Sequence, residues 1–203
     1  MKRTLSFLAG LMLAVLAVLA GVAIPALQAE RFERAVLNTV KPEAVGMSES
    51  DLTAFARETM LYLRGEKQRW EPQTPFAIPE SFTEHMAEVR GWVDALKVLL
   101  PAGGALAVLA LRLGRNGHAA RAGVLCLLGL LAAVLLWAVM DFNSLWMVIH
   151  RVLIPGGIFP AGEPVMQLFP LELFFSYVEA AAWRFAVYLF ILFGILHVCF
   201  PKP

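Results

Sequence analysis

Residues 5–27 form an apolar run without a charged side chain, and this run constrains the fold more than any other feature of the sequence. The hydrocarbon core of a bilayer is about 30 Å thick and a helix rises about 1.5 Å per residue, so roughly 20 apolar residues suffice to cross it. Three later runs meet this length, and 59% of all residues are hydrophobic, more than is usual in water-soluble domains. The sequence therefore predicts an all-α fold, a four-helix transmembrane bundle.

The apolar runs divide the chain into seven segments. The expected transmembrane helices are residues 5–27, 92–112, 119–140 and 181–200. The segments that connect them are residues 28–91, 113–118 and 141–180. Four crossings return the chain to the side on which it began, so both termini and the short turn are expected on the same side of the membrane.

Lysine and arginine in the short flanks decide the expected orientation. On the side of the termini they are Lys2, Arg3, Arg112, Arg115, Arg121 and Lys202. Short flanks rich in these residues stay in the cytoplasm, so both termini are predicted to be cytoplasmic. The extracytoplasmic segments, 28–91 and 141–180, carry 15 Asp and Glu against nine Lys and Arg, a net charge of −6. The whole chain has a net charge of only +1, which gives no reason to expect a nucleic-acid partner.

The N-terminus has a second interpretation. Lys2 and Arg3, the apolar run and the sequence Leu27-Gln28-Ala29 also resemble a signal peptide with a poor cleavage site. The apolar region of a signal peptide usually spans about 7 to 15 residues. The longer run here favours a retained membrane anchor. Cleavage would leave the other three helices and their orientation unchanged.

The first extracytoplasmic segment is predicted to contain a helix. Ser48 and Asp51 have the spacing of a capping box for a helix that runs to about Arg64. Its apolar stripe consists of Leu52, Phe55, Ala56, Thr59, Met60 and Leu63. We expect this stripe to pack on the body of the protein rather than to bind a partner. Three prolines make residues 70–80 an extended loop.

Two of the four histidines, His85 and His150, belong to the extracytoplasmic segments, whereas His118 and His197 lie toward the cytoplasm. The second and third apolar runs are expected to form an antiparallel hairpin around Asn116. His85 precedes this residue by 31 positions and His150 follows it by 34. Arms of nearly equal length place the two imidazoles at a similar height, which predicts one shared site.

An imidazole has an unperturbed pKa of about 6.5 and suits proton transfer near neutral pH. Two of them can divide the work, although each can instead simply hydrogen-bond a loop carbonyl. A metal held by His85, Glu88 and His150 is a further interpretation that no HExxH or paired Cys/His spacing supports. The chain contains no GxSxG, P-loop or dinucleotide-binding glycine pattern. Cys126 and Cys199 lie in apolar runs and are expected to be buried thiols.

Arg184 lies about one turn inside the outer end of the fourth apolar run. A charge at that depth is costly unless it has a partner, so its presence predicts a functional role. Glu179, a lipid carbonyl or a phosphate is the expected partner. The simpler alternative is that the side chain snorkels to the headgroups.

The two histidine segments together resemble the lipoprotein intramolecular transacylase (Lit) family of bacterial integral membrane proteins. The first motif is His85-Met86-Ala87-Glu88-Val89, directly before the second apolar run. The second comprises Asp141-Phe142, Trp146, His150, Pro155-Gly156-Gly157 and the stretch Leu168-Phe169-Pro170-Leu171-Glu172-Leu173-Phe174-Phe175. The family usually has aspartate in place of Glu88 and tryptophan after the two glycines, where this chain has Ile158-Phe159. The order, spacing and side of the motifs extend the resemblance over nearly the whole chain.

The resemblance implies an O-to-N acyl transfer within one substrate molecule. The sn-2 acyl chain of a lipoprotein's diacylglyceryl-cysteine moves to the α-amine of that cysteine and leaves a lyso-form lipoprotein. His85 is then expected to be the general base and His150 the acid or orienter, or the reverse. Glu88 and Asp141 are expected partners of the imidazoles, and Arg184 stabilises the developing oxyanion or grips the lipid. The diacylglyceryl-modified lipoprotein N-terminus is the partner, and no cofactor, metal or nucleotide is required.

The location implied is the bacterial cytoplasmic membrane, crossed several times, with the active site on the extracytoplasmic side. A non-catalytic membrane adaptor or assembly subunit is the alternative function. The histidines would then be structural, and residues 168–175 would form an interfacial docking element. The N-terminal lipopeptides of cellular lipoproteins distinguish the two functions, because only the enzyme relocates an acyl chain.

Overall fold

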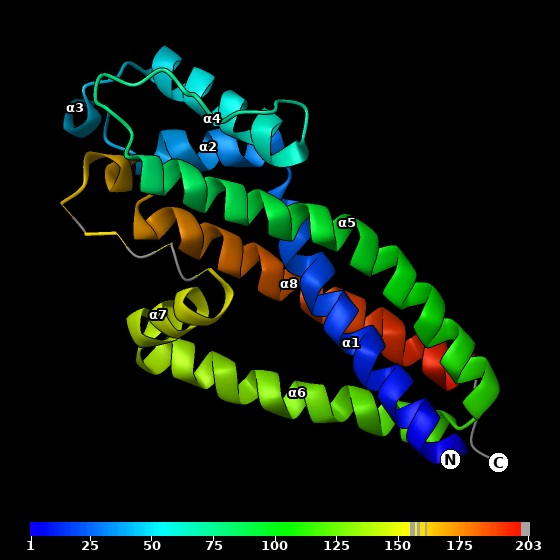
Figure 1. Cartoon of the computed structure of the whole chain (residues 1–203). Coiled ribbons are helices and arrows are strands. Elements are labelled where there is room, and N and C mark those ends of the chain that lie inside the picture. The colour runs from blue at the N-terminus through cyan, green and yellow to red at the C-terminus, as the bar shows by residue number, and fades with distance from the viewer. Residues whose placement is uncertain (155–156, 158, 161, 200–203) are drawn as a thin grey trace. The chain divides into compact units, whose positions relative to one another are not determined.

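The computed structural model of the chain describes residues 1–154, 157, 159–160 and 162–199. In chain order the helices are α1 (Lys2–Ala26), α2 (Ala29–Thr39), α3 (Pro42–Val45), α4 (Glu49–Arg64), α5 (Glu80–Gly114), α6 (Gly117–Met140), α7 (Phe142–Leu153), the 3₁₀ helix η1 (Pro164–Leu168) and α8 (Leu171–Cys199) (Figure 1). These residues contain no strand, so the all-α class is confirmed. Pro155, Gly156 and Ile158 of the second motif, and Lys202, lie outside the described residues.

Four helices, α1, α5, α6 and α8, are long and apolar enough to cross a membrane, which confirms the number that the sequence predicts. Two of them start well before their apolar runs. Helix α5 begins at Glu80 and α8 at Leu171, whereas the runs were expected to begin at residues 92 and 181. The first histidine motif is therefore helical and continuous with a membrane-crossing helix.

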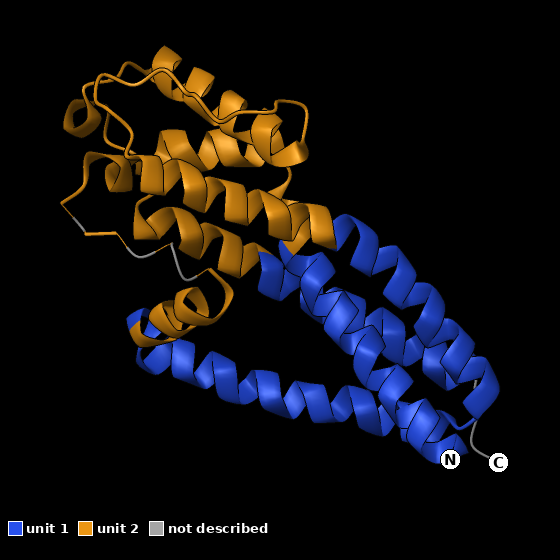
Figure 2. Ribbon diagram, in the orientation of Figure 1, with its two compact units in different colours: residues 1–22, 96–143, 181–203 blue, residues 23–95, 144–180 orange. Residues whose placement is uncertain are grey.

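The chain divides into two compact units (Figure 2). Unit 1 comprises residues 1–22, 96–143 and 181–203, and unit 2 comprises residues 23–95 and 144–180. Helices α1, α5 and α8 each contribute residues to both units. Unit 1 contains most of the apolar helix length, and unit 2 contains His85 and His150.

Small residues allow helices to pack closely inside unit 1. A Cβ atom on Gly10 of α1 would overlap the backbone of Ala120 in α6, and one on Gly123 would overlap the backbone of Phe7. Glycine lets the two backbones touch, as is common where helices pack within a membrane. The Ser6 hydroxyl adds a polar contact, since it accepts a hydrogen bond of 3.2 Å from the backbone N–H of Asn116.

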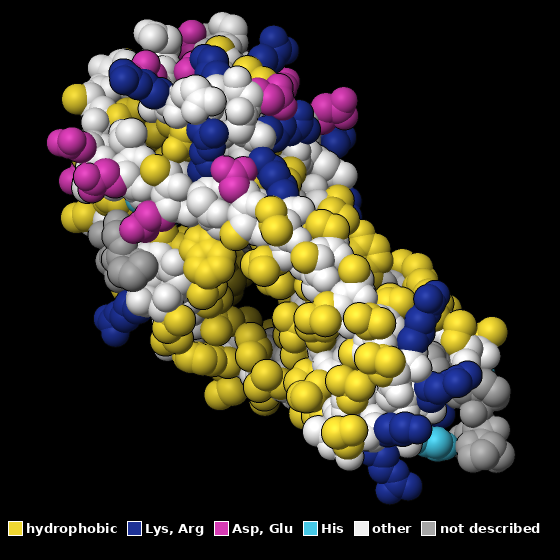
Figure 3. Space-filling model, turned by 45° about the vertical axis from the view of Figure 1, so that its right-hand side comes forward, with side chains coloured by type: hydrophobic (Ala, Val, Ile, Leu, Met, Phe, Trp, Pro, Cys, Tyr) yellow, Lys and Arg dark blue, Asp and Glu magenta, His cyan; other side chains and the backbone are white. Residues whose placement is uncertain are grey.

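The surface of unit 1 is mostly apolar. In the view of Figure 3, hydrophobic side chains cover most of its length and basic side chains lie at its lower end, while the visible acidic side chains gather over unit 2. Leu130, Phe190 and Val198 are among the large exposed apolar residues, as expected of helices whose solvent is lipid. Cys126 and Cys199 are exposed as well. The expectation of buried thiols is wrong, because an apolar run in a membrane helix has a lipid-facing side as well as a buried one.

The capping box of α4 in unit 2 is confirmed. The Ser48 hydroxyl accepts from the backbone N–H of Asp51 at 3.2 Å, and the Asp51 carboxylate accepts from the backbone N–H of Ser48 at 3.0 Å. The helix ends at Arg64, as predicted, because Gly65 adopts a left-handed φ of 85° that is favourable for glycine. Residues 70–79 contain no helix or strand, so the extended loop is also confirmed.

The apolar stripe of α4 packs into the core of unit 2, as we expected. Five of its six residues are buried and the sixth is partly buried: Leu52, Phe55, Ala56, Thr59 and Met60 are the buried ones, and Leu63 is the sixth. Helix α2 packs against α4. The sequence analysis did not predict α2, although Phe32, Ala35 and Val36, its buried residues, have the spacing of a helix face.

An aromatic cluster connects this core to the start of α5. Trp70 is only 2% exposed, and its indole Nε1 donates a hydrogen bond of 3.0 Å to the Thr59 hydroxyl. The ring centroid of Trp70 lies 5.5 Å from that of Phe82, which in turn lies 5.5 Å from that of Phe169. Phe82 is one turn from His85 on α5, so the packing of the core fixes the position of the histidine.

The contribution of the α4 cap is testable. Replacing Ser48 with alanine should lower the free energy of unfolding of unit 2 by about 1 kcal/mol, because the N–H of Asp51 loses its partner. The melting temperature of the purified protein in detergent measures this loss. Ser81→Ala is the control, since it removes an exposed hydroxyl that makes no hydrogen bond within the described structure. An equal shift in both variants would contradict a specific capping role.

Candidate functional site

His85 and His150 meet in unit 2. His85 lies near the start of α5 and is half-buried, and His150 lies in the last turn of α7 and is 8% exposed. Their ring centroids are 6.2 Å apart and the ring planes are inclined by 32°. Rings at this separation can contact one substrate group together. The structure thus brings together the two histidines that were predicted to share a site.

The histidines do not meet in the way that the sequence suggested. Equal arms of one hairpin require the third apolar helix to continue to His150. Instead, α6 ends at Met140, with Asp141 as its C-cap residue, and His150 belongs to the separate helix α7. The two histidines therefore lie close together, but not as equal arms of one hairpin.

A hydrogen bond defines the tautomer of His150. Its Nδ1 lies 3.0 Å from the backbone carbonyl oxygen of Trp146, one turn earlier on α7. A carbonyl oxygen can only accept, so Nδ1 must carry the proton. In the neutral imidazole the lone pair then resides on Nε2. His150 consequently offers one basic nitrogen and is oriented by its own helix.

His85 has a different environment. Its Nδ1 is buried and has no hydrogen-bond partner within the described part of the chain. The residue precedes the apolar run of α5, so it lies outside the membrane-crossing segment expected at residues 92–112. Burial, and secondarily the charge of nearby His150, lower the pKa of His85 to about 4. His85 is therefore neutral at pH 7, and one of its nitrogens can still donate a hydrogen bond.

Aromatic rings enclose the pair of imidazoles. Phe82 and Phe159 contact His85 edge to face, with centroid distances of 5.7 and 5.6 Å. Trp146 lies 4.4 Å from His150, and Phe174 of α8 lies 4.6 Å from Trp146. These rings surround the imidazoles with low-dielectric material, which strengthens hydrogen bonds to a substrate and disfavours ionised imidazole.

Gly157 is a part of the site that the sequence analysis did not identify. A Cβ atom at this position would lie 2.5 Å from Cε1 and 2.6 Å from Nδ1 of His85, and 3.0 Å from Cδ2 of His150. The glycine backbone thus lies against the edges of both rings. Its place in the Gly156-Gly157 pair of the second motif was the available signal, because adjacent glycines often mark a close backbone approach.

The other predicted site residues do not join the pair. Glu88 is exposed, and no hydrogen bond or ion pair links it to either histidine among the described residues. Asp141 and Arg184 belong to unit 1, and both have interactions of their own. Over the same described ranges, no group of three His, Cys, Asp or Glu side chains is arranged to hold a metal ion.

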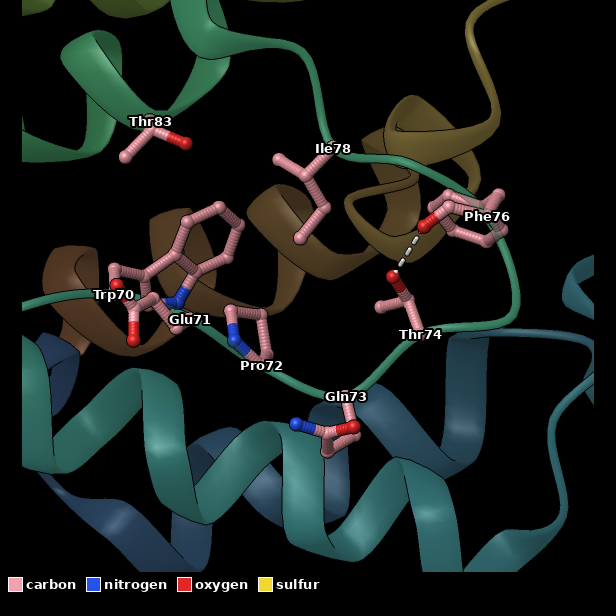
Figure 4. A pocket seen from close by; sticks show the side chains of 8 residues that line it. All are labelled: Trp70, Glu71, Pro72, Gln73, Thr74, Phe76, Ile78 and Thr83. Carbon is pink, nitrogen blue, oxygen red and sulfur yellow. Dashed lines mark hydrogen bonds between the residues drawn. The ribbon is translucent and has the colours of Figure 1, made fainter.

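Unit 2 also has a hollow of about 370 Å³ along the proline-containing loop (Figure 4). The residues that line it are Trp70, Glu71, Pro72, Gln73, Thr74, Phe76, Ile78 and Thr83. The Thr74 hydroxyl donates a hydrogen bond of 2.7 Å to the carbonyl oxygen of Phe76, which shapes the loop. The lining includes neither histidine, so this hollow offers no pair of proton-transfer groups.

The lowered pKa of His85 predicts a dependence of stability on pH. In the unfolded chain His85 takes up a proton below its ordinary pKa of 6.5, whereas the folded protein resists protonation down to about pH 4. Stability should therefore fall as the pH decreases through this window. Melting temperatures of the wild type and of His85→Gln between pH 7 and pH 4 measure it. We expect a shallower slope in the variant; equal slopes would contradict the assignment.

Comparisons with known proteins agree with this architecture. The model of the family described as "Lipoprotein intramolecular transacylase Lit" matches residues 7–175. The structure is similar to the membrane integral lipoprotein intramolecular transacylase Lit from Bacillus cereus, with a TM-score of 0.70, 15% identity, and coverage of 97% of this chain and 93% of that chain.

Two further structures of the B. cereus protein, in which a histidine is replaced by arginine or by alanine, are also similar. Their TM-scores are 0.67 and 0.68 at 15% and 14% identity, and the matches cover 97% of this chain in both cases and 89% and 91% of the other chain. No curated protein matches the chain in sequence. The family match spans most of the chain, and the protein therefore belongs to the lipoprotein intramolecular transacylase Lit family of membrane enzymes.

Proposed function

We propose that the protein moves the sn-2 acyl chain of a lipoprotein's diacylglyceryl-cysteine to the α-amine of the same cysteine, and that His85 and His150 perform the chemistry. The observation that carries this proposal is the 6.2 Å separation of two imidazoles in an aromatic enclosure. Transacylation within one molecule needs proton transfer and positioning but no external acyl donor. Two imidazoles 6.2 Å apart supply both requirements.

The first step is attack of the amine on the ester. An α-amine has a pKa of about 7.7–8.0, so much of it is protonated near neutral pH and must lose a proton before it can attack. The nitrogen loses a second proton as the amide forms. The Nε2 lone pair of His150 is suited to accept the proton that leaves the nitrogen, because Nδ1 is committed to the Trp146 carbonyl. We therefore assign His150 as the general base. Of the two orders that the sequence left open, this is the one in which His85 is not the base.

The second group needed is a donor to the ester carbonyl. Its oxygen gains negative charge as the tetrahedral intermediate forms, and a neutral imidazole N–H can stabilise that charge. The low pKa of His85, about 4, suits this task because the ring stays neutral. The C–O bond to glycerol then breaks, and the imidazolium of His150 returns its proton to the glyceryl oxygen. One C–N bond replaces one C–O bond, and the proton count balances.

The remaining assignments are also proposals. The exposed carboxylate of Glu88 and the acidic balance of the extracytoplasmic segments attract the cationic N-terminus of the substrate. Arg184, at the outer end of the fourth apolar run, binds a lipid carbonyl or phosphate. Asp141, which caps α6, supports the segment that leads into the helix of His150.

The active site is proposed to lie on the extracytoplasmic side, with both termini in the cytoplasm. The distribution of lysine and arginine supports this orientation. A protein without Cys126 and Cys199, given one new cysteine by Ser81→Cys or His118→Cys, tests it. A membrane-impermeant maleimide added to intact cells should label the first variant and not the second. The opposite pattern would reverse the topology.

Mass spectrometry tests the reaction itself. The protein is produced in a host whose lipoproteins carry a diacylglyceryl group and a free α-amine, and the N-terminal lipopeptides are then fragmented. The shift conserves total mass, so the fragment ions must show an N-linked acyl chain and a monoacyl glyceryl group. Lipopeptides that keep both chains on glycerol, despite a normal amount of protein in the membrane, would refute the proposal.

A further inference from the structure

A second hollow in unit 2 lies next to the histidine motif. It has a volume of about 390 Å³ and is lined by Glu88, Gly91, Trp92 and Ala95 of α5 and by Leu153 at the end of α7. Apart from Glu88, every lining residue is apolar or lacks a side chain. Both helices that form it also carry a site histidine, and Glu88 lies one turn after His85 on α5.

The residues of α5 that line the hollow lie on the same side of the helix as His85. His85, Glu88, Trp92 and Ala95 are spaced by three, four and three residues, and helical residues at these intervals lie on one side. The ten residues from His85 to Ala95 correspond to about 15 Å along the axis. That length is about half the thickness of the hydrocarbon core, so it matches the depth of one leaflet.

The hollow is open because of one glycine, and one fixed ring forms its wall. A Cβ atom added to Gly91 would meet nothing within 4 Å. The indole Nε1 of Trp92 donates a hydrogen bond of 2.9 Å to the carbonyl oxygen of Leu153. This bond joins α5 to α7 and satisfies the only polar atom of the indole, so the ring offers an apolar wall. Trp92 and Leu153 are nevertheless 44% and 46% exposed, which leaves apolar surface available.

We propose that this hollow holds the acyl chain that is transferred, with its ester end at the histidines and its methyl end toward Ala95. The inference rests on the proposed function and adds a chain-length determinant to it. An apolar hollow that begins one turn from His85 and runs along α5 to Ala95 matches an ester-linked acyl chain better than a peptide, which would leave backbone polar groups unpaired. Glu88 is the one charged residue that lines the hollow, and it lies at the end that corresponds to the headgroup end of such a chain.

Filling the hollow tests this inference. Gly91→Leu places a side chain in the open space, and Gly104→Leu is the matched control on the same helix, since a Cβ there also meets nothing within 4 Å. Both changes raise helix propensity, so neither is expected to unfold α5. The substrates are two diacylglyceryl lipopeptides that differ only in carrying palmitoyl or octanoyl chains, each presented in mixed micelles with purified enzyme.

We expect Gly91→Leu to lower the ratio of palmitoyl to octanoyl transfer by roughly tenfold, because the leucine side chain fills the space that a few methylenes of the longer acyl chain would occupy. Gly104→Leu should keep the wild-type ratio. An unchanged ratio in Gly91→Leu, or an equal loss for both chain lengths, would overturn the acyl-chain assignment. Absence of transfer by the wild-type enzyme would instead refute the proposed function, so the two failures are distinguishable.

Discussion

Replacement of His150 by alanine should lower the rate of acyl transfer by roughly a thousandfold, since general acid–base catalysis contributes about 10²–10⁴-fold. The residue is 8% exposed and its Nδ1 is bonded to the Trp146 carbonyl, so the variant loses a buried and oriented base. His85→Ala should lose about a hundredfold or more, as expected for a donor to a developing oxyanion. Lipopeptide mass spectrometry at matched amounts of membrane protein measures both losses.

Glutamine variants separate the two roles. A carboxamide can donate a hydrogen bond but cannot take up a proton near neutral pH. His85→Gln should therefore recover about tenfold over His85→Ala, whereas His150→Gln should stay as inactive as His150→Ala. Recovery in His150→Gln without recovery in His85→Gln would give the base role to His85. Melting temperatures of all four variants show whether each still folds.

Gly157→Ala is expected to lower activity by about a hundredfold while leaving the protein folded. The new Cβ atom would lie 2.5 Å from Cε1 of His85 and 3.0 Å from Cδ2 of His150, so both rings must move by several tenths of an ångström or more. Displacements near 1 Å can cost about 10²-fold in rate.

Gly162→Ala is the matched control for this variant. It lies in the same connecting segment, and an added Cβ there meets nothing within 4 Å. We expect Gly162→Ala to retain wild-type activity in the same lipopeptide assay. Wild-type activity in Gly157→Ala would show that the imidazoles tolerate displacement and would argue against a tightly positioned pair.

Local signals in the sequence were sufficient for the helices. Hydropathy predicts the four membrane-crossing helices because each depends only on the composition of its own run. The Ser48–Asp51 pair predicts the start of α4 because a capping box is made within four residues. The stripe of α4 predicts its buried face for a similar reason. By contrast, α2 and α7 were both missed, although the buried residues of α2 have helical spacing and so do Phe142, Leu145, Trp146 and Ile149 of α7.

The site required information that no local pattern contains. The sequence by itself determined that the chain is helical, crosses a membrane and carries two histidines in its longer connecting segments. Only the tertiary structure decided that a separate helix brings His150 to His85, that Gly157 contacts both rings, that Phe159 packs on His85, and that Cys126 and Cys199 are exposed. These contacts join residues far apart in the chain, and they depend on which faces pack in the core of unit 2 and which face lipid, whereas helix formation depends on near neighbours.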